Sequence, residues 1–333
     1  TNATGAWTEQ TLAGPLGDYF GQQLTVTDGN PEILYNDAQG NLVLLRRVED
    51  QWQSSILLGG YEHIWEFQTA VDAAGRRHVL LVDPDMTMLY TICDPTCAEL
   101  ETVAQGDSYE PEAAMVLDEA GNVHLAYRNG TYGNVEVTYA TNAAGAWAYH
   151  AVAITEHDGR NALAIDGAGN AHLLYVREYE ENDDVLFYDH IVGDEVALQQ
   201  VHGDIYRNAN IAIAVDEGDA PHIVYTVQNT DAEGLHYATW VGDAWDDTLL
   251  DAEPNLIGGA LALDSSGKAH VLYSDDGLVY ATNAAGAWQS TMLDGGYGSV
   301  GKMLLTPDGT LHASYFSDGA LTYTFWPPVE PAK

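Results

Sequence analysis

Arginine, histidine and tyrosine are the residues of this chain whose types and spacing could support chemistry on an acidic ligand. The chain has eight arginines, and half of them fall in loops that an internal sequence repeat assigns to one face of the protein: Arg128, Arg160, Arg177 and Arg207. A guanidinium binds a carboxylate or sulfate through two parallel hydrogen bonds. His157 and Tyr206 occur in the same loops, and either could remove the C5 proton of a uronate sugar. These residues predict an anionic-sugar site, with His157 and Tyr206 as the catalytic residues if the protein is an enzyme.

The alternative for these arginines is ion pairing with carboxylates of the same loops. Exposed ion pairs are common and contribute little to stability. The sequence favours this interpretation, because five acidic residues lie within these loops: Glu178, Glu180, Glu181, Asp183 and Asp184.

Aromatic side chains next to carboxylates and amides form a second group with possible chemistry. An aromatic ring can stack on the apolar face of a pyranose while polar groups bind its hydroxyls. The alternative is that these loops are simply solvated. Together with the four arginines, the side chains predicted to bind ligand are Tyr61, His63, Trp65, Tyr109, Glu110, His157, Tyr206 and Tyr297.

Metal ligands are not identified by any motif, although calcium is a candidate cofactor. The segments 83–85 and 180–184 are rich in carboxylates, which calcium prefers, but neither matches the Asp-x-Asp-x-Asp-Gly loop. No nucleotide-binding loop, Gly-x-Ser-x-Gly turn or His-Glu-x-x-His motif is present, so no other cofactor is expected.

Two cysteines, Cys93 and Cys97, occur in the segment Cys-Asp-Pro-Thr-Cys, where one predicted strand should turn into the next. The spacing favours a disulfide across this turn, which implies an oxidising compartment. Two thiols alone would make a poor zinc site.

A repeat defines the elements that must position these side chains. The pattern Asp-x-x-Gly-x-x-His-apolar-x-Tyr occurs in full at 118–127, 166–175 and 264–273, and looser copies surround three further histidines. In a seventh copy, near the start of the chain, Glu32 takes the place of the histidine. This column runs through positions 32, 78, 124, 172, 222, 270 and 312, at spacings of 46, 46, 48, 50, 48 and 42 residues. The period indicates a repeat architecture of seven units.

Each unit is predicted to contain four strands. An alanine-rich apolar run is followed by the Asp-x-x-Gly turn, the His-to-Tyr strand, a third strand with a tyrosine near its end, and a fourth strand that carries tryptophan in most units. The predicted fold is therefore an all-β, seven-bladed β-propeller with four antiparallel strands per blade, spanning residues 1–326. Residues 327–333 are a proline-rich tail or linker.

The two ends of the chain predict how the propeller closes. The segment 1–7 copies 141–147 and 282–288, which each follow a third strand, whereas the last unit ends with an unpaired third strand at 321–324. We therefore expect residues 1–11 to pair with residues 320–326, so that the N-terminal strand joins the last blade and closes the ring.

The repeat resembles those of secreted bacterial propeller proteins, through Asp-x-x-Gly-x-x-His-x-x-Tyr and the following Leu-x-Tyr-Ala-Thr-Asn-x-x-Gly-x-Trp. It is also loosely similar to the seven-bladed propellers of ulvan-type polysaccharide lyases, which implies His, Tyr and Arg acting on uronate. The Ser-x-Asp-x-Gly-x-x-Trp box of sialidases is absent. Because the histidine recurs in six of the seven units, we interpret that column as structural hydrogen bonding.

Composition limits the partners. The net charge of −39 disfavours nucleic acid and anionic membranes, and no apolar run is long enough for membrane insertion. The acidity is compatible with a saline habitat, with bound divalent cations or with colloidal solubility. We expect a secreted or cell-surface, non-catalytic module that binds a glycan or extracellular protein on the funnel face, and it could belong to a longer chain. The alternatives are an acidic-polysaccharide lyase or hydrolase, and a structural cell-surface or filament protein.

Overall fold

The computed structural model describes most of the chain, and the proline-rich tail at 327–333 lies outside the described part. The described residues are 8–13, 21–105, 112–131, 133–156, 159–179, 183–193, 195–203, 205, 209–228, 233–253, 256–294, 298–317 and 319–326. Within these ranges the secondary structure is entirely β, and no helix is long and apolar enough to cross a bilayer.

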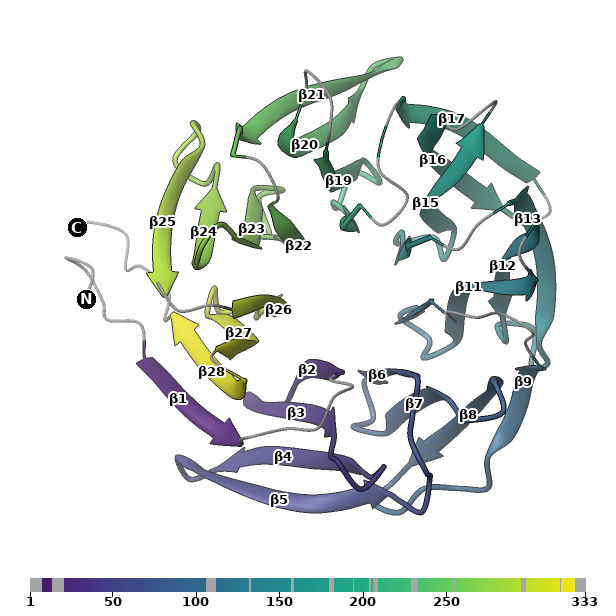
Figure 1. The fold of residues 1–333 in the computed structure, drawn as a ribbon, viewed down its shortest axis with the longest axis vertical. Coiled ribbons are helices and arrows are strands. Elements are labelled where there is room, and N and C mark those ends of the chain that lie inside the picture. The colour runs from purple at the N-terminus through teal and green to yellow at the C-terminus, as the bar shows by residue number, and fades with distance from the viewer. Residues whose placement is uncertain are drawn as a thin grey trace. The chain divides into compact units, whose positions relative to one another are not determined.

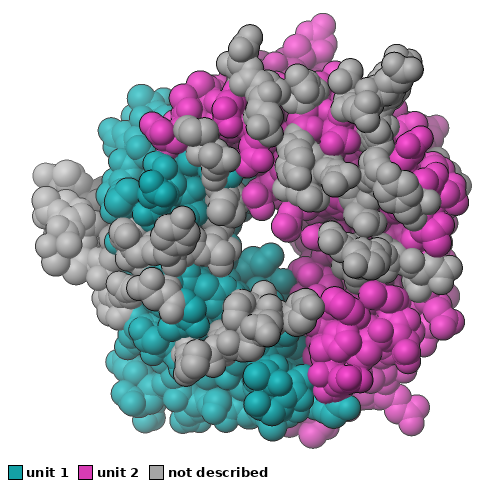
Figure 2. All heavy atoms as spheres, in the orientation of Figure 1, with its two compact units in different colours: residues 1–60, 256–333 teal, residues 61–255 magenta. Residues whose placement is uncertain are grey.

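Seven four-stranded antiparallel sheets make up the described chain, so the predicted seven-bladed β-propeller is confirmed. The blades fall into two compact units, one formed by residues 61–255 and the other by residues 1–60 together with 256–333 (Figure 2).

The unit at 61–255 contains four complete blades, in each of which consecutive strands are neighbours (Figure 1). Their strands are β6 (Glu66–Val71), β7 (Arg77–Val82), β8 (Thr87–Cys93) and β9 (Glu101–Gln105); β10 (Ala113–Leu117), β11 (Val123–Thr131), β12 (Asn134–Thr141) and β13 (Ala148–Thr155); β14 (Asn161–Ile165), β15 (Ala171–Tyr179), β16 (Asp183–Val192) and β17 (Glu195–His202); and β18 (Ile211–Val215), β19 (Pro221–Val227), β20 (Gly234–Val241) and β21 (Ala244–Asp251).

The second unit contains three blades, and one of them combines both ends of the chain. Their strands are β2 (Gln22–Thr27), β3 (Asn30–Asn36), β4 (Leu42–Val48) and β5 (Gln51–Leu58); β22 (Ile257–Leu263), β23 (Ala269–Ser274), β24 (Leu278–Thr282) and β25 (Gln289–Asp294); and β26 (Gly298–Leu305), β27 (Leu311–Ser317) and β28 (Ala320–Trp326), with β1 (Thr8–Ala13) as the fourth strand.

The N-terminal strand β1 lies antiparallel to β28, as the copied N-terminal segment predicted (Figure 1). The register places Gln10 opposite Tyr323, and the side chain of Gln10 accepts a hydrogen bond of 2.9 Å from Trp52 Nε1 on β5. The predicted pairing is therefore confirmed for residues 8–13, while residues 1–7 lie outside the described part.

Apolar side chains of one blade pack against those of the next. In one core cluster, Leu80 and Tyr90 of the β6–β9 blade lie with Met115 and Leu125 of the β10–β13 blade. Because each sheet is apolar on both faces, a blade needs a neighbour on each side, which is typical of repeat proteins.

The repeated histidines make the same contact with a tyrosine hydroxyl in six blades. In six blades the histidine Nδ1 lies 2.5–2.7 Å from a tyrosine hydroxyl of the third strand. In the first of these, His78 Nε2 lies 3.4 Å from the Asp72 carboxylate of the preceding turn. Since an ionised carboxylate can only accept, His78 donates from Nε2 and accepts at Nδ1 from Tyr90.

The carboxylate of this network is stabilised by hydrogen bonds from the protein itself, which supports the structural interpretation of the histidine column. Burial alone would raise the pKa of Asp72, but hydrogen bonds from Arg76 and His78 lower it to about 2. In the first blade Glu32 replaces the histidine, is buried, and accepts hydrogen bonds from Arg46 and Thr27.

The predicted Cys93–Cys97 disulfide is present. Cys93 is the last residue of β8 and is buried, and the bridge closes the turn that leads toward β9.

Candidate functional site

The segment 59–65, which leads into the innermost strand β6, carries three of the predicted ligand-binding side chains. Ile64 is only 2% exposed and anchors this segment in the core. The backbone N–H of Trp65 donates to the carbonyl of Val82 on β7 at 3.0 Å, which fixes the segment to its own blade. The indole of Trp65 remains 37% exposed.

His63 and Trp65 pack edge to face, with ring centroids 4.5 Å apart and planes at 89°. The Nε2 atom of His63 is buried and has no hydrogen-bond partner among the described residues. Tyr61 is half-buried, and its burial together with the Asp83 carboxylate raises the pKa of its hydroxyl, so this group stays neutral. The segment therefore offers an exposed ring face, an unsatisfied ring nitrogen and a neutral hydroxyl. We call Tyr61, His63 and Trp65 the aromatic segment.

Arg128, near the end of β11, is only 2% exposed and its guanidinium reaches into the adjacent blade. Nη2 donates to the carbonyl of Val176 at 2.6 Å, and Nε donates to Oδ1 of Asn161 at 3.2 Å. Asn161 in turn donates from Nδ2 to the carbonyl of Glu112 at 3.3 Å. Arg128 thus links two blades through hydrogen bonds to the protein itself.

Arg160 and Arg177 belong to the blade that Arg128 contacts. Arg160 is about half exposed and forms an ion pair of 3.6 Å with Glu112, a carboxylate that differs from the five considered as partners above. Arg177 is half-buried on β15. Its charge counteracts the effect of burial on Asp189, although burial still raises the pKa of this carboxyl to about 6.

The remaining predicted ligand-binding residues fall outside the described part of the chain: Tyr109, Glu110, His157, Tyr206, Arg207 and Tyr297. The convergence of the four arginines and the catalytic roles of His157 and Tyr206 therefore stay predictions. The same holds for the carboxylates at 180–182 as calcium ligands.

The other calcium candidate, Asp83, stabilises a hairpin turn. Its Oδ1 accepts backbone N–H bonds of 2.9 Å from Asp85 and from Thr87, which shape the hairpin turn between β7 and β8. One carboxylate oxygen is thus committed to the turn.

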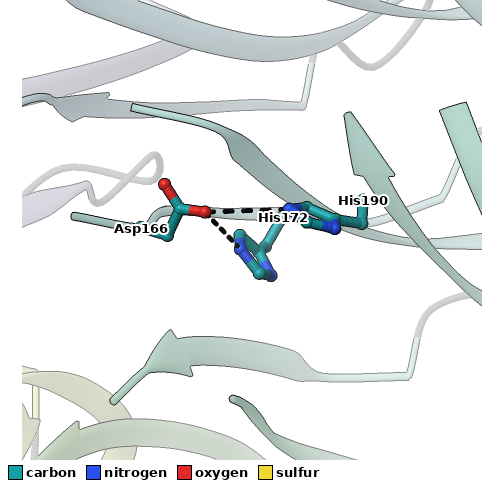
Figure 3. Close-up of side chains that lie close together, drawn as sticks. All are labelled: Asp166, His172 and His190. Carbon is teal, nitrogen blue, oxygen red and sulfur yellow. Dashed lines mark ion pairs between the residues drawn. The ribbon is translucent and has the colours of Figure 1, made fainter. Parts of the chain in front are cut away.

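One group that the sequence analysis missed contains Asp166, His172 and His190 (Figure 3). Their nearest ligand-type atoms lie within 4.8 Å of one another. His172 belongs to the repeated column, but His190 breaks the repeat. The corresponding residue is Thr141, Thr239 or Thr282 in three other blades, so aligning the repeats would have revealed it.

Comparison with known proteins bears on the fold alone. No protein-family model and no curated protein matches the sequence. Among solved structures, BP39L lectin from Burkholderia pseudomallei is 13% identical, with a TM-score of 0.63 over 94% of this chain and 99% of that chain. Aleuria aurantia lectin, solved with α-methyl-L-fucoside, is 13% identical, with a TM-score of 0.57 over 84% and 96%.

A third similar structure is SapL1 lectin in complex with α-methyl fucoside, 11% identical, with a TM-score of 0.54 over 84% of this chain and 97% of that chain. One structure of the Aleuria lectin is described as a six-bladed propeller. These likenesses place the chain among the β-propellers, here with seven blades.

Proposed function

We propose that this protein is a non-catalytic glycan-binding propeller, which binds sugar through the loops that lead into its innermost strands. The observation that carries the proposal is the aromatic segment. Trp65 exposes its ring in a segment anchored by Ile64, and the buried Nε2 of His63 has no hydrogen-bond partner among the described residues. An aromatic platform beside a few convergent polar atoms is the usual composition of a sugar site.

The properties of these side chains fit recognition of an uncharged sugar. The raised pKa of Tyr61 keeps its hydroxyl protonated, so it can both donate to and accept from a sugar hydroxyl. The buried Nε2 of His63 has no partner among the described residues, and leaving such an atom unpaired costs about 1–3 kcal/mol.

The comparisons support the same class of function without determining the ligand. Aleuria aurantia lectin and SapL1 lectin were solved with fucosides, and BP39L is likewise a lectin. A propeller can carry many functions, so this support is an analogy of fold. The Cys93–Cys97 disulfide favours an oxidising, extracellular setting for such a module.

A glycan array probed with the labelled protein tests this proposal. We expect binding to a defined set of glycans, with α-methyl-L-fucoside and an oligouronate included as soluble competitors. Preference for the oligouronate would assign a role to Arg160, which is half-exposed. Absence of binding to any glycan would contradict the proposal.

A parallel assay separates binding from catalysis. Incubation with acidic polysaccharides should leave the ultraviolet absorbance unchanged, because a lyase produces an unsaturated sugar that absorbs there. A steady rise in absorbance that depends on protein concentration would contradict the non-catalytic assignment and support the lyase alternative.

A further inference from the structure

We propose that Asp166, His172 and His190 form a binding site for one divalent transition-metal ion such as Zn²⁺. The site lies in the β14–β17 blade, at the end where the turn between β14 and β15 meets the last residues of β16 (Figure 3). This inference is independent of glycan binding, because it involves none of the residues of the aromatic segment.

The three ligand atoms are already spaced approximately as one metal ion requires. Oδ2 of Asp166 lies 3.5 Å from Nε2 of His172 and 3.7 Å from Nε2 of His190. Ligands at the usual zinc distances of about 2.0–2.2 Å in tetrahedral geometry are about 3.4 Å apart. Two of the three separations are therefore close to the geometry of a bound ion, and the third lies within 4.8 Å.

Both imidazoles present an unpaired nitrogen to this point. His172 is 1% exposed, and its Nε2 has no hydrogen-bond partner among the described residues; the same is true of Nε2 of His190. In the equivalent blades, Nε2 of His78, His124 or His222 lies 3.3–3.4 Å from the turn carboxylate, slightly closer than the 3.5 Å between His172 and Asp166. What distinguishes this blade is the second imidazole, that of His190, beside the same carboxylate oxygen.

The surroundings hold each ligand in place. Asp166 Oδ1 accepts backbone N–H bonds from Ala168 and Asn170, while Oδ2, the oxygen nearest the histidines, also accepts a hydrogen bond of 2.9 Å from Nδ2 of Asn170. The Nδ1 atom of His172 lies 2.7 Å from the hydroxyl of Tyr188, and a partner on the second ring nitrogen is typical of metal-ligating histidines.

The charge around this point also fits a cation. The Asp166 carboxylate lies 3.5 and 3.7 Å from the two imidazole nitrogens. The carboxylate of Asp219, from the next blade, also acts on His172 electrostatically. The His190 side chain is 34% exposed, while its Nε2 atom is buried beside Asp166.

The repeat supplies an internal comparison. The β22–β25 blade contains the same pair, with His270 Nε2 at 3.7 Å from Asp264 Oδ2 and without a hydrogen bond. There, however, the residue opposite the histidine is Thr282, which donates its hydroxyl hydrogen to the carbonyl of Ala269. Only the β14–β17 blade places a second imidazole at this position among the described residues.

The test is Zn²⁺ titration by calorimetry on chelator-stripped protein, with excess Mg²⁺ present to occupy the acidic surface. The variant His190→Thr recreates the arrangement of three other blades and should fold normally, and His190→Gln is a second choice. We expect one tight equivalent in the wild type, and at least about a 100-fold loss of affinity in either variant. His150→Thr, on the outer strand β13, is the matched control and should bind like the wild type.

Nuclear magnetic resonance of the imidazole nitrogens gives an independent readout. Zn²⁺ should shift Nε2 of His172 and of His190, and leave His270 unchanged. Equal affinity in wild type and His190→Thr, or binding without these shifts, would overturn the proposal and identify the ion as bound to the acidic surface.

Discussion

The guanidinium of Arg128 donates a 2.6 Å hydrogen bond to the backbone carbonyl of Val176 in the adjacent blade. This contact ties together two repeats that also meet through apolar packing, the hydrogen bond from Asn161 to Glu112 and the ion pair of Arg160 with Glu112. We predict that Arg128→Met lowers the free energy of unfolding by about 2–3 kcal/mol, because it leaves the buried carbonyl of Val176 and the half-buried Oδ1 of Asn161 without their donor. Urea-induced unfolding measures the change.

Arg160→Ala is the matched control for this prediction. Arg160 is about half exposed and its ion pair with Glu112 is long, so its loss should cost less than about 1 kcal/mol. Equal effects of the two substitutions would contradict the assigned role of Arg128.

The pairing of β1 with β28 predicts that the N-terminal strand is needed for stability. Deletion of residues 1–13 removes β1, exposes the edge of β28 and removes the Gln10 partner of Trp52. The melting temperature should fall by several degrees, and the exposed edge should promote self-association. Calorimetry and light scattering test this, and a synthetic peptide of residues 1–13 should restore part of the loss. An unchanged melting temperature in a monomeric deletion variant would be inconsistent with the closure.

The Cys93–Cys97 bridge closes a very short loop. Restricting such a loop in the unfolded chain is worth about 2 kcal/mol in the chain-entropy model. Reduction, or the double change to serine, should therefore lower stability modestly without unfolding the protein. Thiol titration of the denatured, unreduced protein should find no free thiol, and two free thiols would refute the bridge.

The buried histidines predict that the protein loses stability in acid. Burial lowers the pKa of each histidine of the repeated column outside the β14–β17 blade: His78, His124, His222, His270 and His312. The unfolded chain takes up protons at these rings as pH falls through about 6.5, before the folded protein does. The contribution of these neutral rings to the free energy of unfolding is therefore complete above that pH. Below it, the contribution of each ring falls by up to about 1.4 kcal/mol per pH unit.

Urea unfolding at about pH 7 and about pH 5 measures this effect. The wild type should be clearly less stable at the lower pH, and His124→Gln should show a smaller difference between the two conditions, because one titrating ring is gone. A stability that is constant or rises toward pH 5 would count against the histidine network.

The blades could be predicted from the sequence because each repeat contains the turn residues and the apolar alternation that determine its own hairpins. The Asp-x-x-Gly turn requires a left-handed residue, and Gly75, Gly121 and Gly169 all have φ between 80° and 84°. In the β18–β19 turn Asp219 takes this place with φ of 63°, and the turn forms nevertheless. Local turn chemistry with a period-two apolar pattern therefore determines each hairpin.

Contacts between repeats were harder to predict from the sequence. Nothing in the segment around Arg128 specifies that its partners are Asn161 and Val176, which belong to another blade. His190 was missed for a related reason: its importance depends on lying directly opposite His172 in the sheet. Such relationships depend on register and on packing of blades, which the repeat pattern encodes only when its copies are compared column by column.

The central claim, that the aromatic segment binds sugar, is tested most directly by comparing array binding of the wild type with two aromatic variants. Trp65→Ala removes the 37%-exposed ring but keeps the backbone bond to Val82, whereas Tyr149→Ala removes a 49%-exposed ring from the outer strand β13. We predict that Trp65→Ala weakens binding at least about tenfold, equivalent to 1.4 kcal/mol, while Tyr149→Ala binds like the wild type. Undiminished binding by Trp65→Ala would contradict the account.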